Sequence, residues 1–178
     1  MRSVFRLLGF AAVVATLFSG CDSDSNPTST SGTGRLSVRM TDAPVDEVSS
    51  VNVYVVGLTI KPVGGAVQRI ANDIGLIDLL TLQGTTLELV NLGVPAGDYE
   101  FVMIELDQDQ SNVVPIATGV PEPLQIASEE VKVLGGFNVP DGGDTVVVFD
   151  FDAGKSLKKE GNGDWLLTPV ILQLAPAP

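Results

Sequence analysis

Residues 49–63 read SSVNVYVVGLTIKPV, and apolar residues recur there at every second position. Val51, Val53 and Val55 fall on one face of an extended chain, and the residues that follow are apolar on both faces. Successive side chains of a β-strand point to opposite sides, so this pattern predicts a strand. Strands that are covered on both faces lie inside packed sheets, and we expect this stretch to be a central strand.

The same period of two continues along most of the chain. It is clearest in RLSVRMT at 35–41, DYEFVMIELD at 98–107 and TVVVFDFD at 145–152. The predicted faces are Leu36, Val38 and Met40 in the first run; Tyr99, Phe101 and Met103 opposite Val102, Ile104 and Leu106 in the second; and Val147, Phe149 and Phe151 opposite Val146, Val148, Asp150 and Asp152 in the third. Runs that are apolar on both faces are expected where two sheets pack face to face.

Turn-forming residues separate these runs at short intervals. The predicted turns lie at 64–65 (GG), 72–73 (ND), 95–98 (PAGD), 140–143 (PDGG) and 161–164 (GNGD). No segment has a long 3.6-residue period, although 76–82 would also suit one or two helical turns. Pro115 and Pro169 interrupt apolar runs, which predicts edge strands or bulges. These features predict an all-β fold, a single antiparallel β-sandwich of about seven to nine strands.

The first 21 residues predict export and lipid attachment. Arg2 and Arg6 form a basic start, residues 7–18 are almost wholly apolar, and small residues precede Cys21, the only cysteine of the chain. The apolar run is about a dozen residues, whereas a membrane span needs roughly 20. This order is typical of a secretory signal that ends at a lipoprotein cysteine. We expect residues 1–20 to be a lipoprotein signal peptide and Cys21 to carry the lipid.

Two other interpretations of this leader are an ordinary signal peptide that is cleaved elsewhere and an uncleaved amphipathic start. Cleavage elsewhere would leave one exposed thiol in an oxidising compartment, where thiols pair or oxidise. Phe18 departs from the lipoprotein pattern, which prefers leucine there. Asp22 directly follows the cysteine, where it acts as an inner-membrane retention signal in some bacteria. The choice between inner and outer membrane stays open.

Residues 22–34 read DSDSNPTSTSGTG and contain no hydrophobic residue that could join a core. We expect residues 21–33 to be the acylated cysteine and a disordered tether. At about 5 to 6 Å times the square root of its length, this tether holds the folded part on the order of 20 Å from the lipid. One β-sandwich domain is expected over residues 34–174, with residues 175–178 as a C-terminal tail.

The chain is acidic, with a formal net charge of −12 that becomes −14 when residues 1–20 and their two arginines are removed. Nucleic-acid binders need clustered lysine and arginine, so the composition excludes a general nucleic-acid-binding function. It also disfavours docking on anionic lipid, so anchoring is expected to depend on the acyl chains. We ascribe the acidic surface to solubility in preference to cation binding.

The chain contains no histidine, which excludes nucleophiles activated by an imidazole and zinc sites that need one. Lys155 and Ser156 are adjacent, and in a strand their side chains would point to opposite faces, so they make a poor dyad. Carboxylates are numerous, and glycoside hydrolysis needs two of them about 5 to 10 Å apart. We predict no catalytic residue and no cofactor.

Calcium is the metal that an oxygen-rich chain would favour. In DQDQSN, Asp107, Asp109 and Ser111 occupy the first, third and fifth positions of an EF-hand-like loop. The motif then fails, because Asn112 stands where glycine is required and Thr118 where the bidentate glutamate should be. We expect the acids of this segment to accept hydrogen bonds from turn amides.

A second set of acids follows the same reasoning. Asp150 and Asp152 share one strand face and would share an ion with Asp144 or Asp164 only if loops converge. We expect these acids to accept hydrogen bonds from turn amides or to pair with nearby lysines, and we predict no metal site. The candidate lysines are Lys155, Lys158 and Lys159.

Sugar recognition usually needs exposed aromatic rings, and the chain has one tryptophan and two tyrosines. Trp165 follows a glycine-rich loop, and we expect it to pack at the start of a strand rather than to form a ligand platform. Tyr54 and Tyr99 alternate with core residues. Their rings are expected to be buried, with each hydroxyl reaching a hydrogen-bond partner.

Three stretches together resemble a known family. They are LSVRMTDAPVDEVSSVNVYVVGLTI at 36–60, VPAGDYEFVMIEL at 94–106, and FDFDAGKSL at 149–157 followed by GNGDWLLTPVI at 161–171. In this order they resemble a prokaryotic lipoprotein family known as domain of unknown function 4382. The resemblance covers most of residues 34–174, and FDFDAGKS with LTPVI is its most specific part. It implies a β-sandwich similar to transthyretin-like and carbohydrate-binding-like modules, attached to a membrane or surface, and it implies no activity.

These observations predict an envelope lipoprotein that contacts a membrane through the lipid on Cys21 and is not an enzyme. We expect it to bind or scaffold a protein or glycan partner through its loops or an exposed sheet edge. One alternative is a small envelope hydrolase that uses carboxylates. Another is a structural subunit whose edge strands pair with partners.

Overall fold

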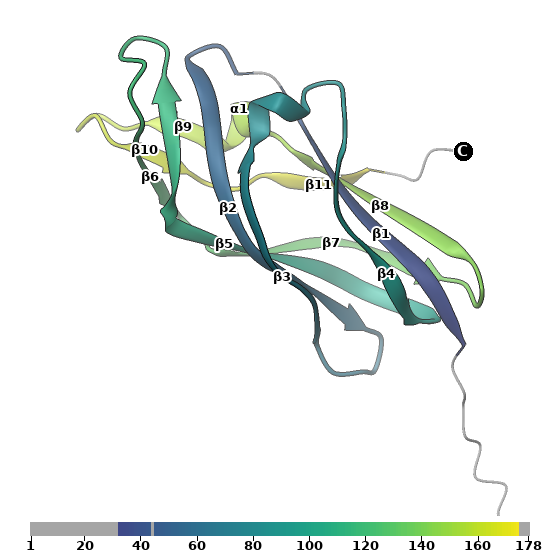
Figure 1. Ribbon diagram of the computed structural model, residues 1–178. Helices are drawn as coiled ribbons and strands as arrows, with labels where there is room; N and C mark the ends of the chain where they lie inside the picture. The colour runs from purple at the N-terminus through teal and green to yellow at the C-terminus, as the bar shows by residue number, and fades with distance from the viewer. Residues whose placement is uncertain (1–31, 44, 175–178) are drawn as a thin grey trace, which may run out of the picture. The chain divides into compact units, whose positions relative to one another are not determined.

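The computed structural model describes residues 32–43 and 45–174, and Figure 1 shows the course of the chain. The predicted signal peptide, Cys21, residues 22–31 and residues 175–178 lie outside the described residues. The elements are β1 (Thr33–Asp42), β2 (Val48–Pro62), β3 (Gln68–Asp78), the 3₁₀ turn η1 (Leu79–Leu82), β4 (Leu87–Pro95), β5 (Gly97–Pro115), β6 (Glu122–Ile126), β7 (Glu130–Val139), β8 (Asp144–Phe151), the helical turn α1 (Ala153–Ser156), β9 (Leu157–Lys159), β10 (Trp165–Leu167) and β11 (Ile171–Leu174).

These strands form two sheets that enclose one hydrophobic core. The four-stranded sheet has the order β11-β8-β1-β4, and the seven-stranded sheet has the order β3-β2-β5-β6-β10-β9, with β7 paired to the first half of β5. Both sheets contribute fully buried side chains, such as Leu36 and Phe149 from the smaller sheet and Leu58 and Ile104 from the larger one. The predicted all-β sandwich is therefore confirmed.

The sheets differ from the prediction in two respects. The described residues form eleven strands where seven to nine were expected, and the sheets are mixed rather than purely antiparallel. β1 runs parallel to β8, and β6 runs parallel to β10. Parallel neighbours require long connections, so no local turn signal marks either pair. β9 and β10 have three residues each, which is too short for an alternating pattern to be recognised.

The predicted inward faces are confirmed in β1, β2 and β8. The buried residues are Leu36, Val38 and Met40 in β1, Val51, Val53 and Val55 in β2, and Val147, Phe149 and Phe151 in β8. In β5, Val102 and its alternating neighbours are buried, whereas Phe101 and Met103 are half-buried on the outer face. Tyr99 is buried because the register against β7 shifts between Tyr99 and Phe101.

One predicted turn is not a turn in the structure, and the ambiguous segment contains a short 3₁₀ turn. Residues 72–73 lie inside β3, where the register against β2 shifts and Asp73 has a φ of 50°. The ambiguous segment 76–82 divides into the end of β3 and the turn η1, whose start is capped when the Asp78 carboxylate accepts a hydrogen bond from Leu80 N. Within the described ranges, no helix is long and apolar enough to cross a membrane.

Of the two prolines that interrupt apolar runs, one ends a strand and the other lies between two strands. Pro115 is the last residue of β5, an inner strand whose register against β2 shifts several times, so the expected bulges are present although the strand is not an edge. Pro169 lies between β10 and β11 and belongs to neither strand. The apolar run LLTPVI is thus divided between two different sheets.

β2 runs the length of the sandwich, so its pairing partners identify the two ends. Val48 pairs with Pro115 at one end, and Pro62 pairs with Tyr99 at the other. The described chain begins at this second end, where Ala96 N donates a 2.7 Å hydrogen bond to Gly32 O. Figure 1 shows the start of β1 and the β2–β3 connection at this end, and the β5–β6 connection at the opposite end.

Candidate functional site

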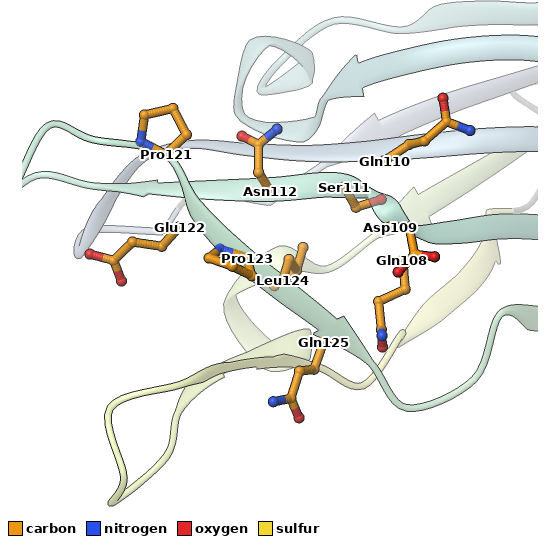
Figure 2. A pocket seen from close by; sticks show the side chains of 10 residues that line it. All are labelled: Gln108, Asp109, Gln110, Ser111, Asn112, Pro121, Glu122, Pro123, Leu124 and Gln125. Carbon is orange, nitrogen blue, oxygen red and sulfur yellow. The ribbon is translucent and has the colours of Figure 1, made fainter.

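A polar hollow of about 380 Å³ lies between β5 and β6 (Figure 2). It is lined by residues 108–112 of β5 and residues 121–125, and we call it the β5–β6 groove. Its lining combines amide and carboxylate side chains with two prolines and Leu124. The groove lies in the half of β5 that pairs with the start of β2, away from Gly32.

A large bulge in β5 forms one wall of the groove. Asn112 pairs with Asn52 and Asp107 pairs with Tyr54, so residues 108–111 of β5 stand opposite a single residue of β2. Ser111 closes the bulge, because its hydroxyl donates to Asp107 O at 2.6 Å and accepts from Tyr54 N at 2.9 Å.

The Asp107 side chain holds the bulge from inside. Its Oδ1 accepts hydrogen bonds from the backbone N–H groups of Asp109 at 2.9 Å and Gln110 at 3.2 Å, and its Oδ2 accepts from Gln110 Nε2 at 2.7 Å. The hydrogen bond from the Gln110 side chain lowers the pKa of the Asp107 carboxyl, and the two backbone hydrogen bonds lower it further. Both carboxylate oxygens are therefore engaged by the loop itself.

Gln108 connects the bulge to β6, which diverges from β5 at this point. The backbone ladder between β5 and β6 covers only Asn112 and Val113. Beyond it, Gln108 Oε1 accepts a 2.8 Å hydrogen bond from Ile126 N, and Gln108 N donates to Glu129 Oε1 at 3.1 Å. The side chain thus replaces a missing backbone contact, and the strands separate into a groove instead of closing.

The other wall is held by Trp165 at the start of β10. Its indole Nε1 donates to Glu122 Oε2 at 2.8 Å, and Glu122 Oε1 accepts from Thr118 Oγ1 at 3.2 Å. Lys159 Nζ lies 5.0 Å from the centre of the indole ring, which is a cation–π contact. A smaller hollow of about 130 Å³ adjoins the groove and shares Glu122, Pro123 and Gln125 with it.

Several groups that line the groove keep hydrogen-bonding capacity. In the part of the chain that the structure describes, the Asp109 carboxylate has no hydrogen-bond or ion-pair partner, and Gln108 uses only its Oε1. Gln125 donates through Nε2 to Asp164 Oδ2 at 3.3 Å, which leaves its Oε1 available. The groove therefore offers both hydrogen-bond donors and acceptors to a ligand.

The predicted role of Asp107 in accepting turn amides agrees with these contacts, because both of its oxygens and the Ser111 hydroxyl are occupied. The second set of acids does not converge. Asp144 begins β8 at the end opposite to Asp152, and Asp164 accepts from Asn162 and Gln125 beside the groove. Among the described residues, no group of three or more acidic or cysteine side chains could hold a metal ion.

Asp152 forms the ion pair that we expected, with Lys155 Nζ. This pair lies in the helical turn α1 rather than in a strand, and the hydrogen bond from Lys155 lowers the pKa of the Asp152 carboxyl. Ser156 is fully buried, where its hydroxyl donates to Asp152 O at 2.6 Å and accepts from Val170 N at 2.9 Å. Lys155 and Ser156 are thus separate structural contacts and not a dyad.

Asp42 is a buried acid that the sequence reasoning missed. It is 6% exposed, Oδ1 accepts from Ala153 N at 2.9 Å, and within the described residues Oδ2 has no hydrogen-bond partner. Burial raises the pKa of this carboxyl to about 6, and the charges of Asp150 and Asp152 add to the rise. The signal was present in β1, because Asp42 continues the inward series that includes Met40.

The aromatic predictions are confirmed in two of three cases. Trp165 is buried at the start of β10, as expected of a packing residue. Tyr99 is buried, stacks on Phe137 with ring centres 4.9 Å apart and donates to Pro95 O at 2.7 Å. The prediction for Tyr54 is wrong in one respect: its ring is only half-buried on the outer face, although its hydroxyl does bond to Asp73.

Comparison with known proteins connects this fold to one family. No curated protein and no solved structure matches the chain. A family model described as "Domain of unknown function (DUF4382)" matches residues 33–169, which include β1 to β10 and the whole β5–β6 groove. The chain therefore belongs to the DUF4382 family.

Proposed function

We propose that this chain is a non-catalytic binding module of the cell envelope, anchored by lipid on Cys21, and that the β5–β6 groove receives its partner. The observation that carries this proposal is the unused hydrogen-bonding capacity of Gln108, Asp109 and Gln125 around one hollow. The walls of the groove are fixed by contacts of their own, so the groove does not need a ligand in order to form. Because the groove is already formed, a ligand that binds there does not have to order its walls, and binding costs less conformational entropy.

The position of the groove supports this arrangement. The segment that carries Cys21 joins the described chain at Gly32, at the end where Ala96 contacts Gly32. The groove lies in the half of β5 remote from that end. The groove therefore lies at the end of the described domain that is remote from Gly32, through which the segment with Cys21 joins it.

The lining favours a protein partner over a glycan. Glycan sites usually present aromatic faces, and the residues that line the groove include no aromatic side chain. Amide and carboxylate groups complement the N–H and C=O groups of an extended peptide, and Pro121 and Pro123 supply apolar contact beside them. We therefore propose a peptide segment of another envelope protein as the ligand.

The hydrolase alternative has less support from the contacts in the groove. Asp109 and Glu122 both line it, but Trp165 and Thr118 engage the two oxygens of Glu122. The acid with the raised pKa, Asp42, is buried at the end of β1 and does not line the groove. A general acid needs to reach its substrate within hydrogen-bonding distance.

Metabolic labelling with a fatty-acid analogue tests the anchor. The wild-type chain should take up label and Cys21→Ala should take up none. Undiminished labelling of Cys21→Ala would overturn lipidation at this residue.

A photo-crosslinking side chain at position 125 tests the groove in the native organism. The matched control is position 83, an exposed glutamine after η1. We expect a discrete protein adduct at 125, absent at 83, that is lost when Asp109→Lys is added. The same adducts at both positions would overturn the binding role. A carbohydrate adduct at 125 would mean that the ligand is a glycan and not a peptide. An adduct with a second copy of the chain would favour the structural-subunit alternative.

A further inference from the structure

The connection between β2 and β3 presents two exposed valines on an ordered turn. We call residues 62–68, PVGGAVQ, the β2–β3 tip; they carry no charge. Val63 is 62% exposed and Val67 is 53% exposed. The turn is held by a 3.1 Å hydrogen bond from Gly65 N to Pro62 O and by Lys61 Nζ, which donates to the same carbonyl group and to Gly65 O. The valines are therefore held outward and not against the core.

This tip lies beside the place where the described chain begins. Val63 N donates to Asp98 O at 2.9 Å, and Ala96 N donates to Gly32 O at 2.7 Å. The short β4–β5 connection around Ala96 thus contacts both the tip and the start of β1. A hollow of about 360 Å³ is lined jointly by the tip and this connection.

The chain contains a second tip of the same kind at the other end of β2. Residues 115–121, PIATGVP, are also uncharged, and Ile116 and Val120 are 63% and 59% exposed. Ile116 N donates to Glu47 O at 3.3 Å, which places this β5–β6 tip beside the start of β2. At about 3.3 Å per residue, β2 separates the two tips by on the order of 45 Å.

The length of chain outside the described residues decides which tip is near the lipid. Ten residues separate Cys21 from Gly32. A chain of this length spans at most about 40 Å when fully extended, and roughly 20 Å on average if unstructured. An anchor at Cys21 therefore leaves the β2–β3 tip within reach of the bilayer, whereas the β5–β6 tip is separated from Gly32 by about the length of β2 as well.

We propose that the β2–β3 tip rests in the lipid interface when the chain is anchored, so that the membrane becomes a second contact that orients the domain. This inference rests on the proposed lipidation of Cys21. Two valines are too few to bind a free protein to a bilayer, but an anchored tip meets the surface at a high effective concentration. At the base of the tip, Glu100 Oε1 lies 3.6 Å from Lys61 Nζ and offsets the positive charge of the lysine. Zwitterionic lipid therefore suits the contact better than anionic lipid.

The test uses the acylated full chain in phosphatidylcholine vesicles. Val67→Cys and, as the matched control, Val120→Cys are each labelled with a polarity-sensitive fluorophore, since acylation blocks the thiol of Cys21. The probe at position 67 should shift to the blue on reconstitution and lose several-fold of its intensity to nitroxide lipids. The probe at position 120 should show neither change.

Flotation of the same samples separates the two proposals. Failure of the acylated chain to float with the vesicles would contradict the anchor itself. Flotation with an unquenched probe at position 67, or with equal quenching at positions 67 and 120, would overturn the tip contact alone. Adding Val63→Glu to the variant labelled at position 67 should abolish quenching and leave flotation unchanged, because this exposed side chain does not contribute to the core.

Discussion

The indole nitrogen of Trp165 and the Glu122 carboxylate form a 2.8 Å hydrogen bond that joins the start of β10 to the start of β6. The ring is buried, and the indole N–H loses its hydrogen-bond acceptor if this carboxylate is removed. We expect Glu122→Ala to lower the free energy of unfolding by about 1 to 3 kcal/mol, because a buried N–H is left unpaired. Urea unfolding followed by the fluorescence of Trp165, the only tryptophan, measures the loss.

Glu122→Gln is the matched control, since its side-chain oxygen still accepts from the indole. Its cost should stay below about 1 kcal/mol, and Trp165 should keep the emission of a buried ring. Equal losses for the two variants would contradict the importance of this hydrogen bond and assign the effect to packing around β6.

Phe149 tests the core of the smaller sheet. Its ring is fully buried between the sheets, and we expect Phe149→Ala to cost about 3 to 5 kcal/mol in chemical denaturation. Val146 lies on the opposite face of β8 and is partly exposed, so Val146→Ala should cost less than about 1 kcal/mol. A loss below 1 kcal/mol for Phe149→Ala would mean that the faces of β8 are assigned wrongly.

The faces of β1, β2 and β8 could be predicted because alternation is a local property of a strand. Leu36, Val38 and Met40 alternate with polar residues, and that alternation alone decides which side is buried. The partner of each strand is not local. The parallel pairing of β1 with β8 joins Leu36 to Thr145, and no residue near either position encodes the other.

The candidate site was predictable only in part for the same reason. The segment DQDQS partly matches a cation-binding loop, and in the structure it forms a bulge in β5. The groove depends on Gln108 reaching Ile126, a contact between two strands whose separation follows from that bulge. Short-range patterns predict which residues turn, but they do not predict which strands diverge.

The occupied oxygens of Asp107 lead to a prediction about calcium. The carboxylate already accepts three hydrogen bonds from its own loop, so a cation would have to compete with these donors for its oxygens. We expect millimolar calcium or a chelator to leave the melting temperature unchanged. An ion that binds the folded chain and is present at 100 times its Kd would raise the free energy of unfolding by about 2.7 kcal/mol. For a chain of this size the melting temperature would rise by several degrees. A rise of more than about 2 °C would contradict this assignment.

Asp42 makes stability depend on pH. Its pKa is raised to about 6 in the folded chain, whereas an unfolded aspartate titrates near 3.9. Below about pH 3 both states hold the proton. As the pH rises, the unfolded state loses its proton first while the folded state keeps it. The free energy of unfolding therefore falls until the folded carboxyl also ionises near pH 6. The loss amounts to about 3 kcal/mol at pH 7, because two pKa units separate the states.

Asp42→Asn removes this titration and keeps an oxygen that accepts from Ala153 N. The free energy of unfolding of the variant should gain about 3 kcal/mol relative to the wild type between pH 4 and pH 7. Urea unfolding of both proteins at half-unit pH intervals measures the difference. Parallel pH curves for the two proteins would contradict the prediction, because they would mean that water or a movement of β1 solvates the buried carboxylate.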